Sequence, residues 1–127
     1  MKEDASAFPL PKPSTEPIPI RVGEREELEQ RISRDTKKQF DAYRKLSPEA
    51  LAAREKDFET TDEGVANDAQ ALIRGNRGKE RAVLVTQTGI DAIDRELTEE
   101  KNPEMIKLLN AAKTYRQRLV IACEASI

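Results

Sequence analysis

The spacing of hydrophobic residues divides the chain into an extended arm and a series of amphipathic helices. From Gly23 onward, apolar side chains recur every three or four residues, the repeat of an α-helix with one buried face. Residues 1–22 lack this repeat and carry five of the seven prolines, which exclude a helix or a central strand there. We therefore predict an all-α fold with an extended Pro-rich arm over 1–22, an N-terminal helical segment over 23–59 and a helical hairpin over 60–127.

Within the arm, β-branched residues alternate with other side chains. An extended backbone would turn these alternating residues toward one surface, and an aromatic and a leucine further out follow the same pattern. We predict a partner-binding arm that uses five residues: Phe8, Leu10, Ile18, Ile20 and Val22. The alternative is a terminal tail that binds nothing.

Two helices are expected between residues 23 and 59. One apolar stripe defines the first of them, with Thr36 filling its gap: Leu28, Ile32, Phe40, Tyr43 and Leu46. Ser47 and Pro48 then have the residue types of a helix cap and first helical position, so a short second helix follows.

A heptad repeat predicts a coiled-coil-like hairpin in the last part of the chain. Its first arm starts near Thr60, which stands in capping-box spacing with Glu63, and runs to about Glu100; Asn102 and Pro103 start the second arm. Antiparallel pairing sets Leu97 beside Leu108 and Val83 beside Ala122. The expected seam consists of Val83, Ile90, Ile93, Leu97, Leu108, Tyr115 and Leu119.

The hairpin leaves apolar residues uncovered at its open end, over 82–85 and 119–123. Either the first helix folds back onto them or a second copy of the chain covers them, and we favour the second copy. Dense β-branched residues leave open whether 82–86 and 118–122 are helix or strand, although the sustained heptads favour helix.

The stretch RGNRGK, residues 74–79, interrupts the heptads with two glycines among basic residues. A helix kink or a short loop is one interpretation, because each glycine weakens a helix by about 1 kcal/mol. In the other interpretation, GNRG resembles the GxxG loop with which KH domains hold a nucleic-acid backbone. That resemblance implies phosphate contacts from Arg74, Arg77 and Lys79.

Composition excludes several classes of chemistry. The chain has no histidine, so imidazole catalysis and His-containing metal sites are absent, and its single cysteine, Cys123, is expected in the core. We expect no catalytic residues, no metal, no cofactor and no small-molecule substrate. Lys and Arg number 22 against 24 Asp and Glu, a net charge of −2 that does not favour nucleic acid as the partner. The longest apolar run, 119–123, is far below the roughly 20 residues of a membrane span, and the N-terminus lacks a signal-peptide core.

These observations predict a non-enzymatic structural or interaction protein with protein partners, in a homo-oligomer or hetero-assembly. Its organisation is of the kind found in small accessory subunits of virions and other multi-subunit complexes. We expect it in the cytoplasm, or associated with a particle if it is a virion component. The alternative is a small nucleic-acid-binding regulator that uses the basic GNRG loop.

Overall fold

The computed structural model describes residues 18–126, and this part of the chain is all-helical, with no strand. Five helices follow one another: α1 (Glu24–Tyr43), α2 (Pro48–Asp57), α3 (Asp62–Asn76), α4 (Lys79–Glu99) and α5 (Pro103–Ala125). The predicted all-α class is therefore confirmed for these residues. Segments 82–86 and 118–122, for which strands remained an alternative, lie inside α4 and α5.

Side-chain caps fix the starts of α2, α3 and α5. Ser47 Oγ accepts a hydrogen bond from the Ala50 N–H at 3.2 Å, and Asn102 Oδ1 accepts one from the Glu104 N–H at 3.0 Å, which confirms both predicted caps. At α3 the capping residue is Thr61 and not the predicted Thr60. Thr61 has the extended backbone that a cap requires, and its hydroxyl reaches the Gly64 N–H at 3.0 Å.

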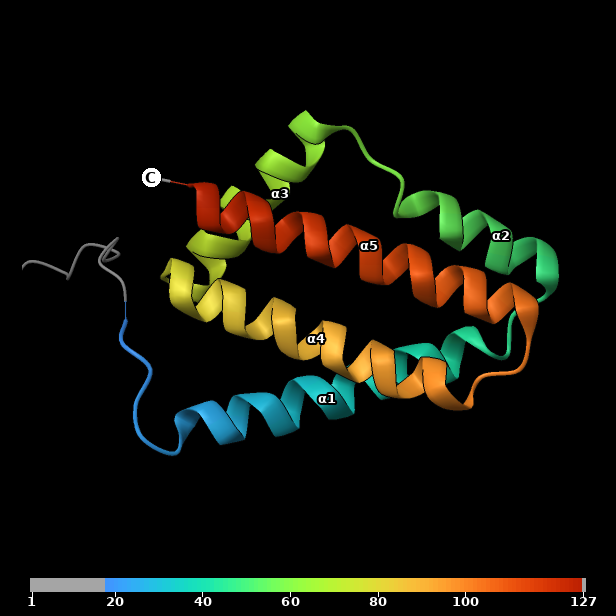
Figure 1. The fold of residues 1–127 in the computed structure, drawn as a ribbon, viewed down its shortest axis with the longest axis horizontal. Coiled ribbons are helices and arrows are strands. Elements are labelled where there is room, and N and C mark those ends of the chain that lie inside the picture. The colour runs from blue at the N-terminus through green and yellow to red at the C-terminus, as the bar shows by residue number, and fades with distance from the viewer. Residues whose placement is uncertain (1–17, 127) are drawn as a thin grey trace, which may run out of the picture.

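Helices α4 and α5 run antiparallel and pack against each other, with the other three helices around them (Figure 1). Helix α1 lies on α4, α2 lies on α5, and α3 contacts both α4 and α5. The segments 23–59 and 60–125 thus pack together into one unit. Either α1 or a second copy of the chain was expected to cover the apolar surface of the hairpin. In the structure, α1 folds back onto α4.

The core consists of two hydrophobic clusters along the α4–α5 pair. The first lies toward the α4–α5 connection and the second toward the C-terminal end of α5. The buried members of the first are Phe40, Leu51, Ile93, Met105, Leu108, Leu109 and Ala112. Those of the second are Val65, Ala69, Ala82, Leu119 and Cys123. Helix α4 is buried on two sides because α5 covers one side and α1 another, where Leu84 is only 6% exposed.

Residues 60–125 form three helices, not the two arms of a simple hairpin. The chain breaks between α3 and α4 at Arg77, whose backbone is left-handed with φ 54° and ψ 46°, and at Gly78, with φ 152°. Two hydrogen bonds close the end of α3, from the Arg77 N–H to the Arg74 carbonyl at 3.2 Å and from the Gly78 N–H to the Ile73 carbonyl at 3.0 Å. This is the Schellman pattern that ends helices, so residues 74–79 contain a helix end and a short connection.

Candidate functional site

Arg81 holds the last residues of the predicted arm against the bundle. Its Nε donates to the Ile18 carbonyl at 3.0 Å and its Nη2 to the Pro19 carbonyl at 3.1 Å. Its Nη1 also lies 2.6 Å from a carboxylate oxygen of Glu24. The Arg81 side chain is only 13% exposed, so these charge-assisted bonds are shielded from water.

A second set of contacts fixes the same segment. The Ile18 N–H donates to the Arg77 carbonyl at 2.8 Å, and the Arg21 N–H donates to a Glu24 carboxylate oxygen at 3.0 Å. The hydrogen bond from Arg81 is the main reason why the pKa of Glu24 lies below its ordinary value. The chain therefore enters the bundle at a defined place, beside the α3–α4 connection.

The predicted arm residues do not all share one surface. Ile18 and Ile20 are half-buried against the bundle, whereas Val22 is fully exposed, at 106%. The chain turns at Val22 and Gly23, where Gly23 has φ 87° and the Glu24 N–H donates to the Arg21 carbonyl at 3.1 Å. This turn ends the extended geometry on which the prediction for Val22 depended. Phe8 and Leu10 lie outside the described residues.

The GNRG segment does not offer a backbone cradle for phosphate. The N–H groups of Arg77 and Gly78 are used within the cap of α3, and the Asn76 side chain donates to the Leu72 carbonyl at 2.8 Å. A KH domain also requires a sheet, and residues 18–126 contain no strand. The resemblance is thus limited to four residues that form a helix end.

The three predicted phosphate contacts separate in the structure. Lys79 Nζ donates to the backbone carbonyls of Glu124 and Ser126, so it fastens the C-terminal end of α5. Arg74 is exposed on α3. Arg77 alone of the three lines a hollow of about 590 Å³ between the start of α1 and the α3–α4 connection.

That hollow brings together arginines that are far apart in the sequence. Arg21, Arg31, Arg77 and Arg81 line it, with Glu24 and Glu27 as the acidic residues. In the sequence, Arg81 is only one of the basic residues that flank GNRG, and its contact with the arm and Glu24 is recognisable only once α4 lies beside the start of α1. No spacing along the chain signals that contact.

The predicted seam residues belong to the two core clusters, apart from Ile90. Ile93 and Leu108 are fully buried in the first cluster, and Leu97 packs against it. Leu119 is buried in the second cluster, against which Val83 and Tyr115 pack. Ile90 is also buried, at 4% exposure.

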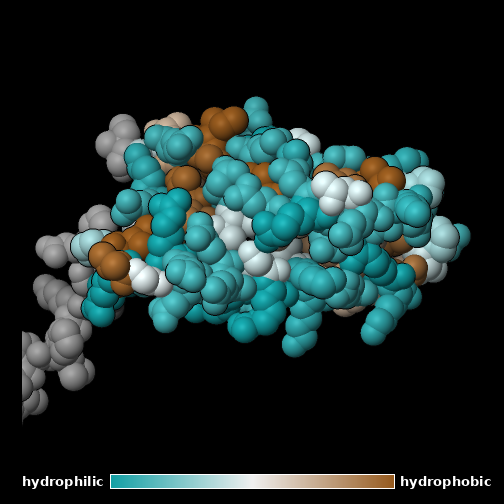
Figure 2. Space-filling view, turned by 60° about the horizontal axis from the view of Figure 1, so that its bottom comes forward, coloured by the Kyte–Doolittle hydropathy of each residue, from teal (hydrophilic) through white to brown (hydrophobic). Residues whose placement is uncertain are grey.

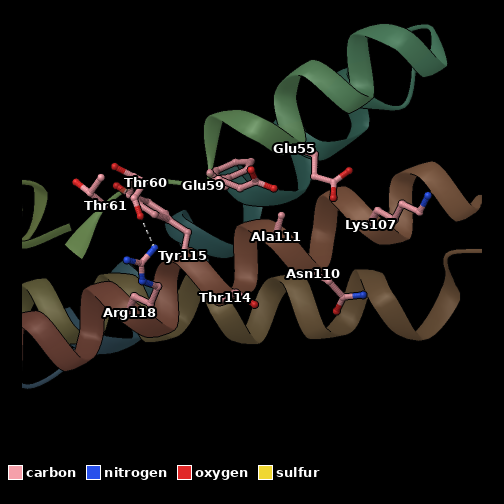
Figure 3. Close-up of a pocket in the computed structure, with 11 residues that line it drawn as sticks. Glu55, Glu59, Thr60, Thr61, Lys107, Asn110, Ala111, Thr114, Tyr115 and Arg118 are labelled. Atoms are coloured by element: carbon pink, nitrogen blue, oxygen red, sulfur yellow. Dashed lines mark hydrogen bonds between the residues drawn. The ribbon is translucent and has the colours of Figure 1, made fainter. Parts of the chain in front are cut away.

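A second hollow, of about 710 Å³, lies between the α2–α3 connection and α5 (Figure 3). Its polar groups serve the fold: Arg118 Nη1 donates to the Thr60 carbonyl at 2.8 Å, and the Tyr115 hydroxyl donates to Asp68 at 2.6 Å. Burial, followed by the bond to Asp68, raises the pKa of Tyr115 to about 12. These contacts hold α5 to α3 and to the α2–α3 connection.

Cys123 is fully buried in the second cluster, as expected, and burial raises the pKa of its thiol, which keeps it protonated. Within residues 18–126, no group of three or more metal-ligating side chains comes together. None of the described helices is long and apolar enough to cross a membrane. Comparison of the chain with protein-family models, with curated proteins and with solved structures found no match.

Proposed function

We propose that this protein is a non-enzymatic structural subunit, held in a larger assembly of its own copies through the Pro-rich arm and the apolar surface beside it. The observation that carries the proposal is the attachment of Ile18 and Pro19, the last residues before the turn into α1, by hydrogen bonds with Arg81 and Arg77. A segment that starts from a fixed point loses less conformational freedom when it binds than one on a mobile linker. In this role the protein is cytoplasmic or associated with a particle such as a virion.

Exposed apolar side chains at the same end of the bundle support the proposal. Val22 is 106% exposed and Ile121, in the last turns of α5, is 67% exposed. Figure 2 shows hydrophobic atoms gathered where the described chain begins, on a face that is otherwise mostly hydrophilic. Lys79, the first residue of α4, bonds to the end of α5, and Arg81, in the same turn of α4, bonds to Ile18. Together with the arm, these residues would form one contact region.

The α4–α5 pair supplies the rigid element of the proposed subunit. It would act as the coiled-coil-like hairpin expected from the heptads, with Ile93, Leu108 and Leu119 in its buried seam. A rigid pair of helices with a binding arm at one end is suited to positioning neighbours in an assembly.

The test is the molecular mass in solution, measured by light scattering over a range of concentrations. The full chain should have a mass of at least twice the 14.3 kDa of one copy. A chain without residues 1–17, and a Val22→Ser/Ile121→Ser variant, should dissociate at concentrations at which the full chain does not. Leu46→Ser is the matched control, because Leu46 is 37% exposed at the α1–α2 connection, at the other end of the bundle. A full chain that remains a monomer throughout would refute the proposal.

A further inference from the structure

More arginines than carboxylates line the hollow beside the α3–α4 connection. Arg81 is paired with Glu24, which leaves Arg21, Arg31 and Arg77 against the single carboxylate of Glu27. All three arginines are exposed where they line the hollow. This local excess contrasts with the net charge of −2 of the whole chain. We propose that this hollow is a binding site for the phosphodiester backbone of a single-stranded nucleic acid.

The backbone at Arg77 is an independent observation in favour of the site. Its φ of 54° is the only positive φ of a non-glycine residue among residues 18–126. Such a conformation is unfavourable for a residue with a side chain, and strained backbone conformations of this kind cluster at binding sites. Glycine is the usual residue at this position of the helix end, and here an arginine takes it and lines the hollow.

The arrangement of the arginines favours a polymer over a single small anion. They come from three places: the segment before α1, α1 itself and the α3–α4 connection. The forked guanidinium group suits phosphate oxygens, and a chain with a charge on every nucleotide can meet all three groups. Along α1, the exposed Lys38 stands two turns beyond Arg31 on the same side, about 10 Å further, and extends the track.

This site adjoins the proposed assembly surface, because Val22 also lines the hollow, but it uses different side chains, namely the arginines. It also differs from the phosphate contacts expected from the sequence. It keeps Arg77 but replaces Arg74 and Lys79 with Arg21 and Arg31. It also uses side chains in place of the backbone amides, which the helix end already occupies.

The experiment is a titration of the full chain with a short fluorescent homopyrimidine oligonucleotide at several salt concentrations. Three phosphate contacts predict a slope of log affinity against log salt on the order of −2, since each contact to a single strand contributes about 0.7. Arg31→Gln and Arg77→Gly should each lower the magnitude of that slope by about 0.7. The triple variant Arg21→Gln/Arg31→Gln/Arg77→Gly should lose binding. Arg54→Gln, an exposed arginine on α2 at the other end of the bundle, should bind like the unchanged chain.

Arg77→Gly separates loss of the site from loss of the fold. Glycine suits the left-handed backbone, so this variant should melt at a higher temperature while it binds more weakly. Equal binding by the unchanged chain and the triple variant, or no binding at low salt, would overturn the proposal. If pyrophosphate competes with the oligonucleotide at an equal concentration of phosphate groups, the ligand is a small phosphate compound and the nucleic-acid assignment is wrong.

Discussion

The guanidinium group of Arg81, near the start of α4, lies 2.6 Å from the carboxylate of Glu24, the first residue of α1. The same guanidinium group binds the carbonyls of Ile18 and Pro19. One side chain therefore joins the start of α1, the start of α4 and the last arm residues, which are more than 55 positions away from it in the sequence.

Replacing Arg81 by methionine, which keeps most of its apolar stem, should release this segment while the rest of the bundle stays folded. Hydrogen exchange should accelerate at the amides of Ile18 and Arg21, because the carbonyls and the carboxylate that position them lose their partner. Exchange in α2, which contacts α5, should not change. Arg74→Met is the control, since Arg74 is exposed on α3, and unchanged exchange at Ile18 in Arg81→Met would contradict the role of Arg81.

The Arg81 bond also predicts a pH dependence. The hydrogen bond from Arg81 lowers the pKa of Glu24 below its ordinary value of 4.5. The ionised Glu24 carboxylate therefore makes its full contribution to stability above pH 4.5. The contribution is lost as the pH falls through the lowered pKa of the folded protein. Denaturation curves at decreasing pH should show this loss in the unchanged chain and a smaller loss in Arg81→Met.

Leu108→Ala should destabilise the protein by about 2–5 kcal/mol, because the side chain is fully buried between α4 and α5. Leu46→Ala removes the same side chain at a position that is 37% exposed and lies outside the proposed contact region, and should cost clearly less. Chemical denaturation of both variants measures the difference. A loss below about 1 kcal/mol for Leu108→Ala would show that this residue is not central to the core.

Local signals in the sequence predicted the helices well. Ser47–Pro48 and Asn102–Pro103 mark helix starts through chemistry within one turn, and the structure confirms them. The stripe from Leu28 to Tyr43 likewise predicted the first helix, although its end at Tyr43 leaves Leu46 outside. Each of these signals depends on neighbouring residues only, so it can be identified without the fold.

The sequence could not show which surface covers which. Whether α1 or a second copy of the chain covers α4, similar apolar residues become buried. The hydrophobic pattern could therefore not distinguish the two arrangements. The candidate site has the same origin: Arg21 and Arg31 approach Arg77 only because α1 folds back beside the α3–α4 connection. The left-handed backbone of Arg77 could not be predicted either, since Gly75 and Gly78 were the better candidates for a positive φ.

Gly89, inside α4, should be coupled energetically to Arg116 of α5. A methyl group at Gly89 would lie 3.3 Å from Arg116 Nε, so the arginine must shift. Arg116 is confined, because its Nη1 donates to the Ala112 carbonyl at 3.2 Å and its guanidinium carbon lies 5.9 Å from the centre of the Phe58 ring. Burial also lowers the pKa of Arg116.

Gly89→Ala alone should therefore gain less than the roughly 1 kcal/mol that alanine usually adds to a helix. In the Arg116→Leu background, where no guanidinium group has to move, the full gain should return. A double-mutant cycle measures this coupling by chemical denaturation. Equal effects of Gly89→Ala in both backgrounds would contradict the contact.

Ionisation of the Tyr115 hydroxyl should lower the free energy of unfolding in alkaline solution. Burial and the 2.6 Å bond to Asp68 raise its pKa to about 12 in the folded protein, from an ordinary value of 10.0. The neutral hydroxyl is the form that the fold prefers, so its contribution is complete below pH 10 and is lost as the pH rises toward 12. Tyr115→Phe lacks this ionisation, and its stability relative to the unchanged chain should improve over that range.

Other groups also ionise in alkaline solution, so the difference between the two chains is the quantity to measure. At neutral pH, Tyr115→Phe should be less stable by about 0.5–1.5 kcal/mol, the usual net value of a hydrogen bond. Above pH 10 that gap should shrink, because ionisation of Tyr115 removes the donor to Asp68 and places two negative charges side by side. Tyrosinate absorbance gives an independent readout, since one of the two tyrosines should titrate near 12 and that step should disappear in the variant. A gap that stays constant from neutral pH to pH 12 would mean that the bond between α3 and α5 does not form in solution.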